Sequence, residues 1–148
     1  MRRPVRALAV AGALAGTALL AGCDKPVPKI TVQSGSFSTT ITASSYCFDP
    51  KHCRAQRLEL PAVSARPDDT VLIDVPRTLA GRGWSATAIS LNTLKAIGGA
   101  TVVEDRHSTR VAASINQGAP FIVQVQQLRH GKPDGSKWSF LVKISDSA

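Results

Sequence analysis

Apolar and polar residues alternate along much of the chain beyond residue 29. The clearest example is residues 138–144 (WSFLVKI), where every second side chain, beginning with Trp138, is large and apolar. A similar alternation runs through residues 121–128 (FIVQVQQL). A period of two is typical of half-buried β-strands, because successive side chains point to opposite faces. The sequence HGKPDGS at 130–136 separates these runs and is rich in turn formers, so we expect a hairpin with a protruding tip.

The same alternation, interrupted by turn residues, predicts further strands. They are residues 30–33, 37–43, 57–60, 70–75, 84–91, 101–104 and 110–115. No segment keeps the 3.6-residue apolar period of an amphipathic helix, although residues 91–97 are also compatible with a single helical turn. Many short strands separated by turns are typical of a β-sandwich. We therefore expect one all-β domain at residues 30–148, an immunoglobulin-like or cupredoxin-like sandwich of about seven to nine strands.

The N-terminus has the composition of a secretory signal. Three arginines fall within the first six residues, and an uncharged run of mostly small apolar residues follows at 7–22. This run is shorter than the about 20 residues that a helix needs to cross a bilayer, which favours a cleaved signal peptide over an uncleaved membrane anchor. The run ends in LLAGC at 19–23, which resembles the lipobox of bacterial lipoproteins. The resemblance implies a signal peptide at 1–22, cleavage before Cys23, and attachment of acyl chains such as palmitate to that cysteine.

Cleavage would leave a moderately basic chain held at the membrane. The full sequence has 18 Lys and Arg residues against 10 Asp and Glu residues, and three of the arginines belong to the expected signal. The 15 basic residues that remain are dispersed and not interleaved with aromatic residues, so nucleic-acid binding is not indicated. Residues 23–29 contain two prolines and are expected to form an extended tether, with Lys25 and Lys29 close to anionic headgroups or anionic envelope polymers. We therefore expect the protein at the extracytoplasmic face of the cell membrane.

Two further cysteines, Cys47 and Cys53, lie close together in the sequence. Outside the cytoplasm such a pair predicts a disulfide, which would restrain a local turn. The alternative is a metal site in which Asp49 and His52 join the two cysteines. Zinc sites usually show two well-separated ligand pairs, and no second pair follows here, so we favour the disulfide and expect no metal.

No motif predicts catalysis. The sequence GWSAT at 83–87 lacks the second glycine of a nucleophile elbow. The adjacent carboxylates Asp68 and Asp69 would point to opposite faces of a strand, which does not suit paired acid and base catalysis. A blue-copper site usually needs an axial methionine, and the only methionine is Met1. We therefore expect a protein that is not an enzyme and has no cofactor.

One loop is a candidate for partner binding. The sequence LAGRGW at 79–84 places Trp84 beside flexible glycines. A tryptophan at the start of a strand is compatible with a core position, but an exposed ring would make Arg82 and Trp84 part of a binding loop. Both interpretations remain open from the sequence.

Several of these features together resemble a known family. They are CDKP at 23–26, the cysteine pair, RPDDTV at 66–71, IDVP at 73–76 and GW at 83–84. This combination is similar to a domain-of-unknown-function family of actinobacterial secreted lipoproteins, although the RPDD turn departs from the Pro-Gly-Asp form expected there. The resemblance covers about residues 19–145. It implies a lipid-anchored envelope domain and brings no catalytic residues.

We therefore expect a lipid-anchored lipoprotein of the cell envelope that acts as a non-enzymatic binding or accessory module. Its partner would be an envelope protein or an anionic polymer, bound through strand-end loops or an exposed strand edge. The alternative is an extracytoplasmic carrier of a small ligand or a metal.

Overall fold

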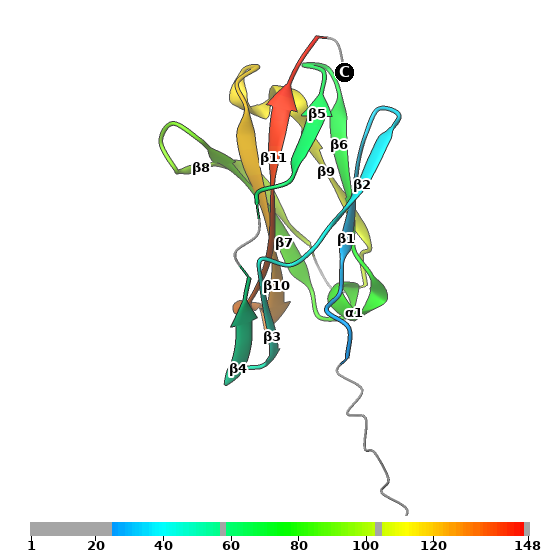
Figure 1. The fold of residues 1–148 in the computed structure, drawn as a ribbon, viewed down its shortest axis with the longest axis vertical. Helices are drawn as coiled ribbons and strands as arrows, with labels where there is room; N and C mark the ends of the chain where they lie inside the picture. The colour runs from blue at the N-terminus through cyan, green and yellow to red at the C-terminus, as the bar shows by residue number, and fades with distance from the viewer. Residues whose placement is uncertain (1–24, 57–58, 103–104, 147–148) are drawn as a thin grey trace, which may run out of the picture.

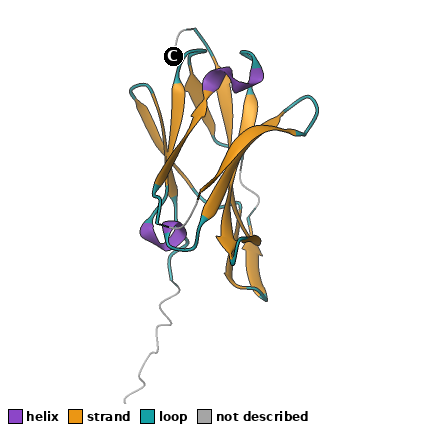
Figure 2. Cartoon of the chain, turned by 180° about the vertical axis from the view of Figure 1, so that it is seen from behind, coloured by secondary structure: helices purple, strands orange, loops and turns teal. Residues whose placement is uncertain are grey.

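The computed structural model describes residues 25–56, 59–102 and 105–146. Within these residues, eleven strands form two sheets that pack face to face, which confirms the expected all-β sandwich (Figures 1 and 2). The predicted signal peptide at 1–22 and the predicted lipidation site Cys23 lie outside the described residues.

The first sheet contains β1 (Ile30–Ser34), β2 (Phe37–Ile41), β6 (Thr70–Asp74) and β9 (Ser108–Ala112). The strands are antiparallel and lie in the order β2–β1–β6–β9. Alternate residues of β1 and β6 are buried, as expected for strands with one face against a core. A two-residue turn connects β1 to β2, and its Gly35 has a φ of 55°, which glycine adopts without strain.

The second sheet contains seven strands. They are β3 (Ser45–Asp49), β4 (His52–Ala55), β5 (Ala62–Ala65), β7 (Trp84–Ser90), β8 (Ala96–Val102), β10 (Phe121–Arg129) and β11 (Lys132–Ile144). Six of them follow the order β4–β3–β11–β10–β7–β8, and β5 pairs in parallel with the C-terminal part of β11. β10 and β11 pair with each other along most of their length, which confirms the predicted hairpin.

The number of strands exceeds the expected seven to nine because the segment around the cysteines forms β3 and β4. All four residues of β4 are exposed, so its sequence carries no alternation of apolar and polar positions. The strand predicted at 57–60 is wrong in its position: residues 57–58 lie outside the described residues, and residues 59–60 belong to no strand. β5 begins instead at Ala62, where pairing with β11 decides the conformation of a short run of small residues.

The β7–β8 connection also differs from the prediction. The strand predicted at 101–104 begins earlier, at Ala96, because two glycines in β8 obscure its pattern. The helical turn considered for residues 91–97 is a hydrogen-bonded turn and not a helix: the Leu94 N–H donates to the Ser90 carbonyl oxygen at 2.9 Å, and β8 begins at Ala96.

The tip of the terminal hairpin is smaller than expected. β10 and β11 are joined by a two-residue turn, His130 and Gly131, with φ values of 52° and 74°. Two-residue hairpins with positive φ match the twist of the strands that they connect. The remaining turn formers lie within β11, because a register shift opposite Gln127 accommodates them in the strand.

The chain enters the sandwich at one end and leaves it at the other (Figure 1). Residues 25–29 lead into β1, where Thr31 pairs with Asp74 at the end of β6, and α1 (Arg77–Ala80) follows β6 there. The turn between β1 and β2, the 3₁₀ helix η1 (Ala113–Asn116) and the last residues of β11 lie at the opposite end (Figures 1 and 2). We call these the tether end and the distal end. Neither of the helical segments in the described ranges is long and apolar enough to cross a bilayer.

The core lies between the two sheets. It contains four fully buried aromatic rings, Trp84, Phe121, Trp138 and Phe140. The indole Nε1 of Trp138 donates a hydrogen bond to the Pro28 carbonyl oxygen at 2.9 Å. This bond attaches the last residues of the tether to the second sheet.

Candidate functional site

The loop predicted to bind a partner lies at the tether end. Trp84 is 0% exposed, and its Nε1 donates a hydrogen bond to the Arg106 carbonyl oxygen at 2.8 Å. The ring therefore belongs to the core and offers no surface to a partner, which corrects the inclusion of Trp84 in a binding loop. Arg82 is exposed on the same loop and shares a depression of about 360 Å³ with Arg129 and His130.

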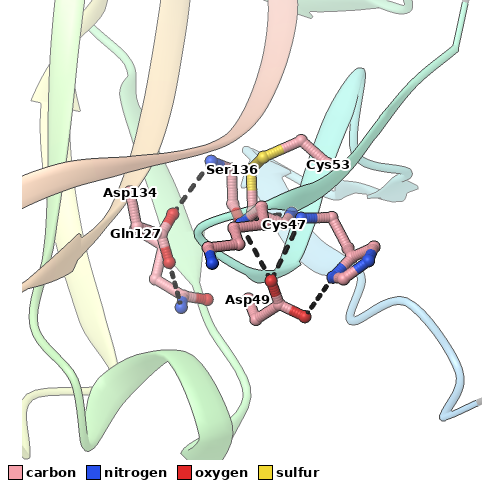
Figure 3. Close-up of a disulfide and its surroundings, with 8 residues drawn as sticks. Cys47, Asp49, Cys53, Gln127, Asp134 and Ser136 are labelled. Carbon is pink, nitrogen blue, oxygen red and sulfur yellow. Dashed lines mark hydrogen bonds and ion pairs between the residues drawn. A yellow bond between two sulfur atoms is a disulfide. The ribbon is translucent and has the colours of Figure 1, made fainter.

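Cys47 and Cys53 form the predicted disulfide (Figure 3). The two residues face each other across β3 and β4, and their Cα atoms are 3.9 Å apart. Because each sulfur is bonded to the other, neither is a thiolate that could coordinate a metal. The disulfide therefore excludes a metal site built on these two thiolates.

Asp49 organises the turn that the disulfide closes. Its Oδ1 accepts hydrogen bonds from the backbone N–H groups of Lys51 (2.8 Å) and His52 (3.1 Å), and its Oδ2 lies 2.6 Å from His52 Nδ1 (Figure 3). The backbone N–H of Lys51, followed by the imidazole of His52, lowers the pKa of the Asp49 carboxyl. Among the described residues, no group of three or more His, Cys, Asp or Glu side chains could hold a metal ion. The Asp49–His52 pair is therefore part of an exposed turn.

A polar cluster connects the disulfide hairpin to the second sheet. Gln127 is 1% exposed, and its Nε2 donates to Asp134 Oδ2 at 2.8 Å. The other carboxylate oxygen of Asp134 accepts from the backbone N–H of Ser136 at 2.9 Å, and Ser136 Oγ accepts from the backbone N–H of Cys47 at 3.0 Å (Figure 3). A Cβ at Gly135 would lie 2.7 Å from Cys47 Sγ, so the strand can approach the disulfide only with glycine there. These groups satisfy one another and leave no open site.

The distal end contains a pocket of about 430 Å³. It lies between the β1–β2 turn, β5 and the turn that precedes β6, and its lining includes Ser34, Ser36, Phe37, Ser64, Arg66 and Asp69. Ser34 is 4% exposed. Its Oγ is buried and lacks a hydrogen-bond partner, unlike the other buried side-chain polar atoms of the described residues. Phe37 is 49% exposed although it is a large apolar residue.

The lining of this distal pocket is suited to binding. An exposed aromatic ring offers apolar contact area, and the exposed hydroxyls of Ser36 and Ser64 can donate or accept hydrogen bonds. Asp69 is already engaged, because its Oδ2 accepts from the backbone N–H of Arg66 at 2.8 Å. Sequence reasoning missed the pocket, since Ser34 and Phe37 appear there as ordinary strand residues and only the packing of β5 against β1 brings the walls together.

Comparisons of the chain with protein-family models, curated proteins and solved structures give no match. The interpretation of these surfaces therefore rests on their geometry.

Proposed function

We propose that the protein is a lipid-anchored, extracytoplasmic binding module that is acylated at Cys23 and uses the distal pocket to bind its partner. The observation that supports the proposal is that the tether and the β1–β2 turn lie at opposite ends of the sandwich (Figure 1), and residues of this turn line the distal pocket. An anchor at Cys23 would hold the tether end at the bilayer, and the distal pocket would face away from it.

The dimensions of the chain support this orientation. An extended, proline-containing tether at 23–29 spans about 20 Å, at about 3 Å per residue. β1 adds about 17 Å between the tether and the distal pocket, at about 3.3 Å for each of its five residues. The distal pocket would therefore stand in the space beyond the lipid headgroups, where an envelope protein or polymer is accessible.

The chemistry of the distal pocket favours binding over catalysis. Phe37 and the exposed hydroxyls of Ser36 and Ser64 provide the mixture of apolar area and placed polar groups that is typical of binding sites. A small ligand is the second candidate occupant, because the exposed hydroxyls of Ser36 and Ser64 line the pocket with Phe37 and can bond to a hydrogen-bonding group of a ligand.

Acylation is tested on the full chain expressed in a lipoprotein-processing bacterium. Mass spectrometry of the detergent-extracted protein should find an N-terminal peptide that begins at Cys23 and carries acyl chains. A Cys23→Ala variant should leave the membrane fraction or retain residues 1–22. A free thiol at Cys23 in the mature protein would contradict the anchor.

Binding is tested with a photoreactive amino acid at position 37, introduced into the same full chain in living cells. The matched control carries it at Leu94, which is 74% exposed in the β7–β8 turn. We expect one dominant crosslinked species from position 37 that is absent from position 94 and is reduced by Ser64→Val, which removes an exposed hydroxyl from the pocket lining. Equal crosslinking from both positions would contradict the distal pocket as the binding site. If no protein is crosslinked, a rise in melting temperature with candidate small ligands that disappears in Ser64→Val would favour the second occupant.

A further inference from the structure

Basic side chains gather at the tether end of the sandwich. They come from the tether, α1, the loop after α1, the β8–β9 connection and the β10–β11 turn. They are Lys25, Lys29, Arg77, Arg82, Arg106, Arg129 and Lys132. Among the described residues, none of the seven forms an ion pair. We call this set the basic end face.

Acidic residues do not balance the basic end face. The described acidic residues at this end are Asp49, Asp74, Asp105 and Asp134, fewer than the basic ones. Asp49 already accepts hydrogen bonds within its own turn, and Asp134 accepts two within the polar cluster. At the distal end, by comparison, basic and acidic residues are equal in number. Its described charges are Arg66, Lys95 and Lys143 against Asp68, Asp69 and Asp146. The positive charge of the protein is therefore concentrated where the tether leaves the fold.

Two arginines from distant parts of the sequence meet on this face. The backbone N–H of Leu128 donates to the Gly83 carbonyl oxygen at 2.9 Å, which brings the end of β10 against the loop after α1. Arg82 and Arg129 therefore line one depression of about 360 Å³, together with the ring of His130. Two guanidinium groups around one depression suit a phosphate group, because each can donate paired hydrogen bonds to its oxygens.

We propose that the basic end face binds the anionic phospholipid headgroups of the bilayer that holds the tether. A tether of about 20 Å keeps this face close to the lipid surface, and electrostatic attraction acts within about 8 Å of that surface at physiological salt. Each Lys or Arg close to an anionic membrane raises the binding constant by about fivefold. Contact through this face would orient the sandwich so that the distal pocket points away from the membrane. The orientation rests on the proposed anchor, but the affinity for anionic lipid does not.

The test uses the chain from residue 23 onward with Cys23→Ala, so that no lipid is attached; all the described strands lie within this chain. Its binding is measured by co-sedimentation with vesicles of phosphatidylcholine and with vesicles in which one third of the lipid is phosphatidylglycerol. We expect binding to the second kind alone, and loss of that binding at high salt. Absence of binding to phosphatidylglycerol vesicles at low salt would overturn the proposal.

Charge reversal locates the surface. Arg82→Glu with Arg129→Glu removes two attractions and adds two repulsions, so the binding constant should fall by at least about 25-fold. The control Lys95→Glu with Lys143→Glu makes the same change in net charge at the distal end and should change the binding constant by less than about threefold. Circular dichroism confirms that both variants are folded, and Arg82→Gln with Arg129→Gln replaces the first variant if it is not. Equal decreases in the binding constant of the two variants would overturn the assignment of lipid binding to the basic end face.

A further outcome separates the lipid from other polyanions. If a soluble anionic polysaccharide binds more tightly than the phosphatidylglycerol vesicles, the proposed headgroup contact is overturned in favour of an envelope polymer. Because the protein in these measurements carries no lipid, they are independent of acylation at Cys23. Failure of the anchor and failure of the headgroup contact are therefore distinguishable.

Discussion

Removal of the disulfide is expected to destabilise the protein modestly and to act mainly on the β3–β4 hairpin. β3 attaches the hairpin to β11, and the Tyr46 ring on β3 also lies against the ring of Trp138. The hydrogen bonds that link this segment to β11 include the Ser44 N–H donating to the Lys137 carbonyl oxygen at 2.8 Å, and the Cys47 N–H donating to the side-chain Oγ of Ser136 at 3.0 Å. β4 is exposed throughout. The disulfide therefore restrains mainly the exposed edge strand β4, which it ties to the partly buried β3.

The expected loss of stability follows from the length of the closed loop. The two cysteines are separated by 6 positions, and closing so short a loop reduces the entropy of the unfolded chain by an amount equivalent to about 2 kcal/mol. This value is an upper limit for the loss. If the hairpin opens locally once the crosslink is gone, the native state also gains entropy, and the loss in the free energy of unfolding becomes smaller.

The measurement is urea denaturation of the Cys47→Ala, Cys53→Ala double variant, carried out with Cys23→Ala so that no thiol remains. Fluorescence of the buried Trp84 and Trp138 reports the sandwich itself. With a urea slope of about 2 kcal/mol/M, the midpoint should fall by about 1 M or less. Reduction of the parent chain should give the same shift.

Amide hydrogen exchange of the same double variant should show lost protection in β3 and β4 and preserved protection in β10. Two results would refute the reasoning. A loss of more than about 4 kcal/mol would mean that the hairpin is part of the cooperative core. Loss of protection in β10 would mean the same.

Three further predictions follow from the packing of single residues. Trp84→Phe removes the indole hydrogen bond and part of the ring volume, so the free energy of unfolding should fall by about 1–3 kcal/mol; an unchanged denaturation midpoint would contradict this. Gly99→Ala places a Cβ against the Ala86 carbonyl oxygen of β7 and should lower the melting temperature strongly. The control Gly81→Ala should be tolerated, because the atom nearest to its Cβ is 3.4 Å away. Equal changes in melting temperature in the two variants would refute the close approach of β7 and β8. The pKa of the Asp49 carboxyl is lowered by the backbone N–H of Lys51 and by the imidazole of His52. The ionised carboxylate therefore stabilises the turn at pH values above the usual aspartate pKa, and this stabilisation is lost as the pH falls through the lowered pKa. An NMR titration of that carboxyl with a midpoint at or above the usual value would contradict the last prediction.

Some elements could be predicted because their signal is local. The hairpin of β10 and β11 has a strong period of two, and the two strands are close in sequence. The disulfide joins neighbouring cysteines, whose proximity needs no knowledge of the fold. Other elements could not be predicted. β5 consists of small residues whose strand conformation depends on pairing with β11, which is far away in sequence. The turn formers of the hairpin lie inside β11 because hydrogen bonds to Gln127 and Cys47 hold them there.

The candidate surfaces show the same division. Nothing around Ser34 and Phe37 in the sequence indicates a pocket, because its walls come from three separate segments. The basic residues appear evenly dispersed along the chain, and only the fold gathers seven of them at one end. The burial of Trp84 also depends on distant residues, since its hydrogen-bond acceptor lies 22 positions further along the chain.

The sequence by itself determined that this protein is an all-β sandwich with a local disulfide. Both properties follow from interactions between near neighbours, namely the alternation of side chains along a strand and the closeness of two thiols. The tertiary structure alone decided which end of the sandwich is basic, where the distal pocket opens, and that the ring of Trp84 is buried. These properties depend on strand order, register and the packing of two sheets, which are set by contacts between residues far apart in the chain.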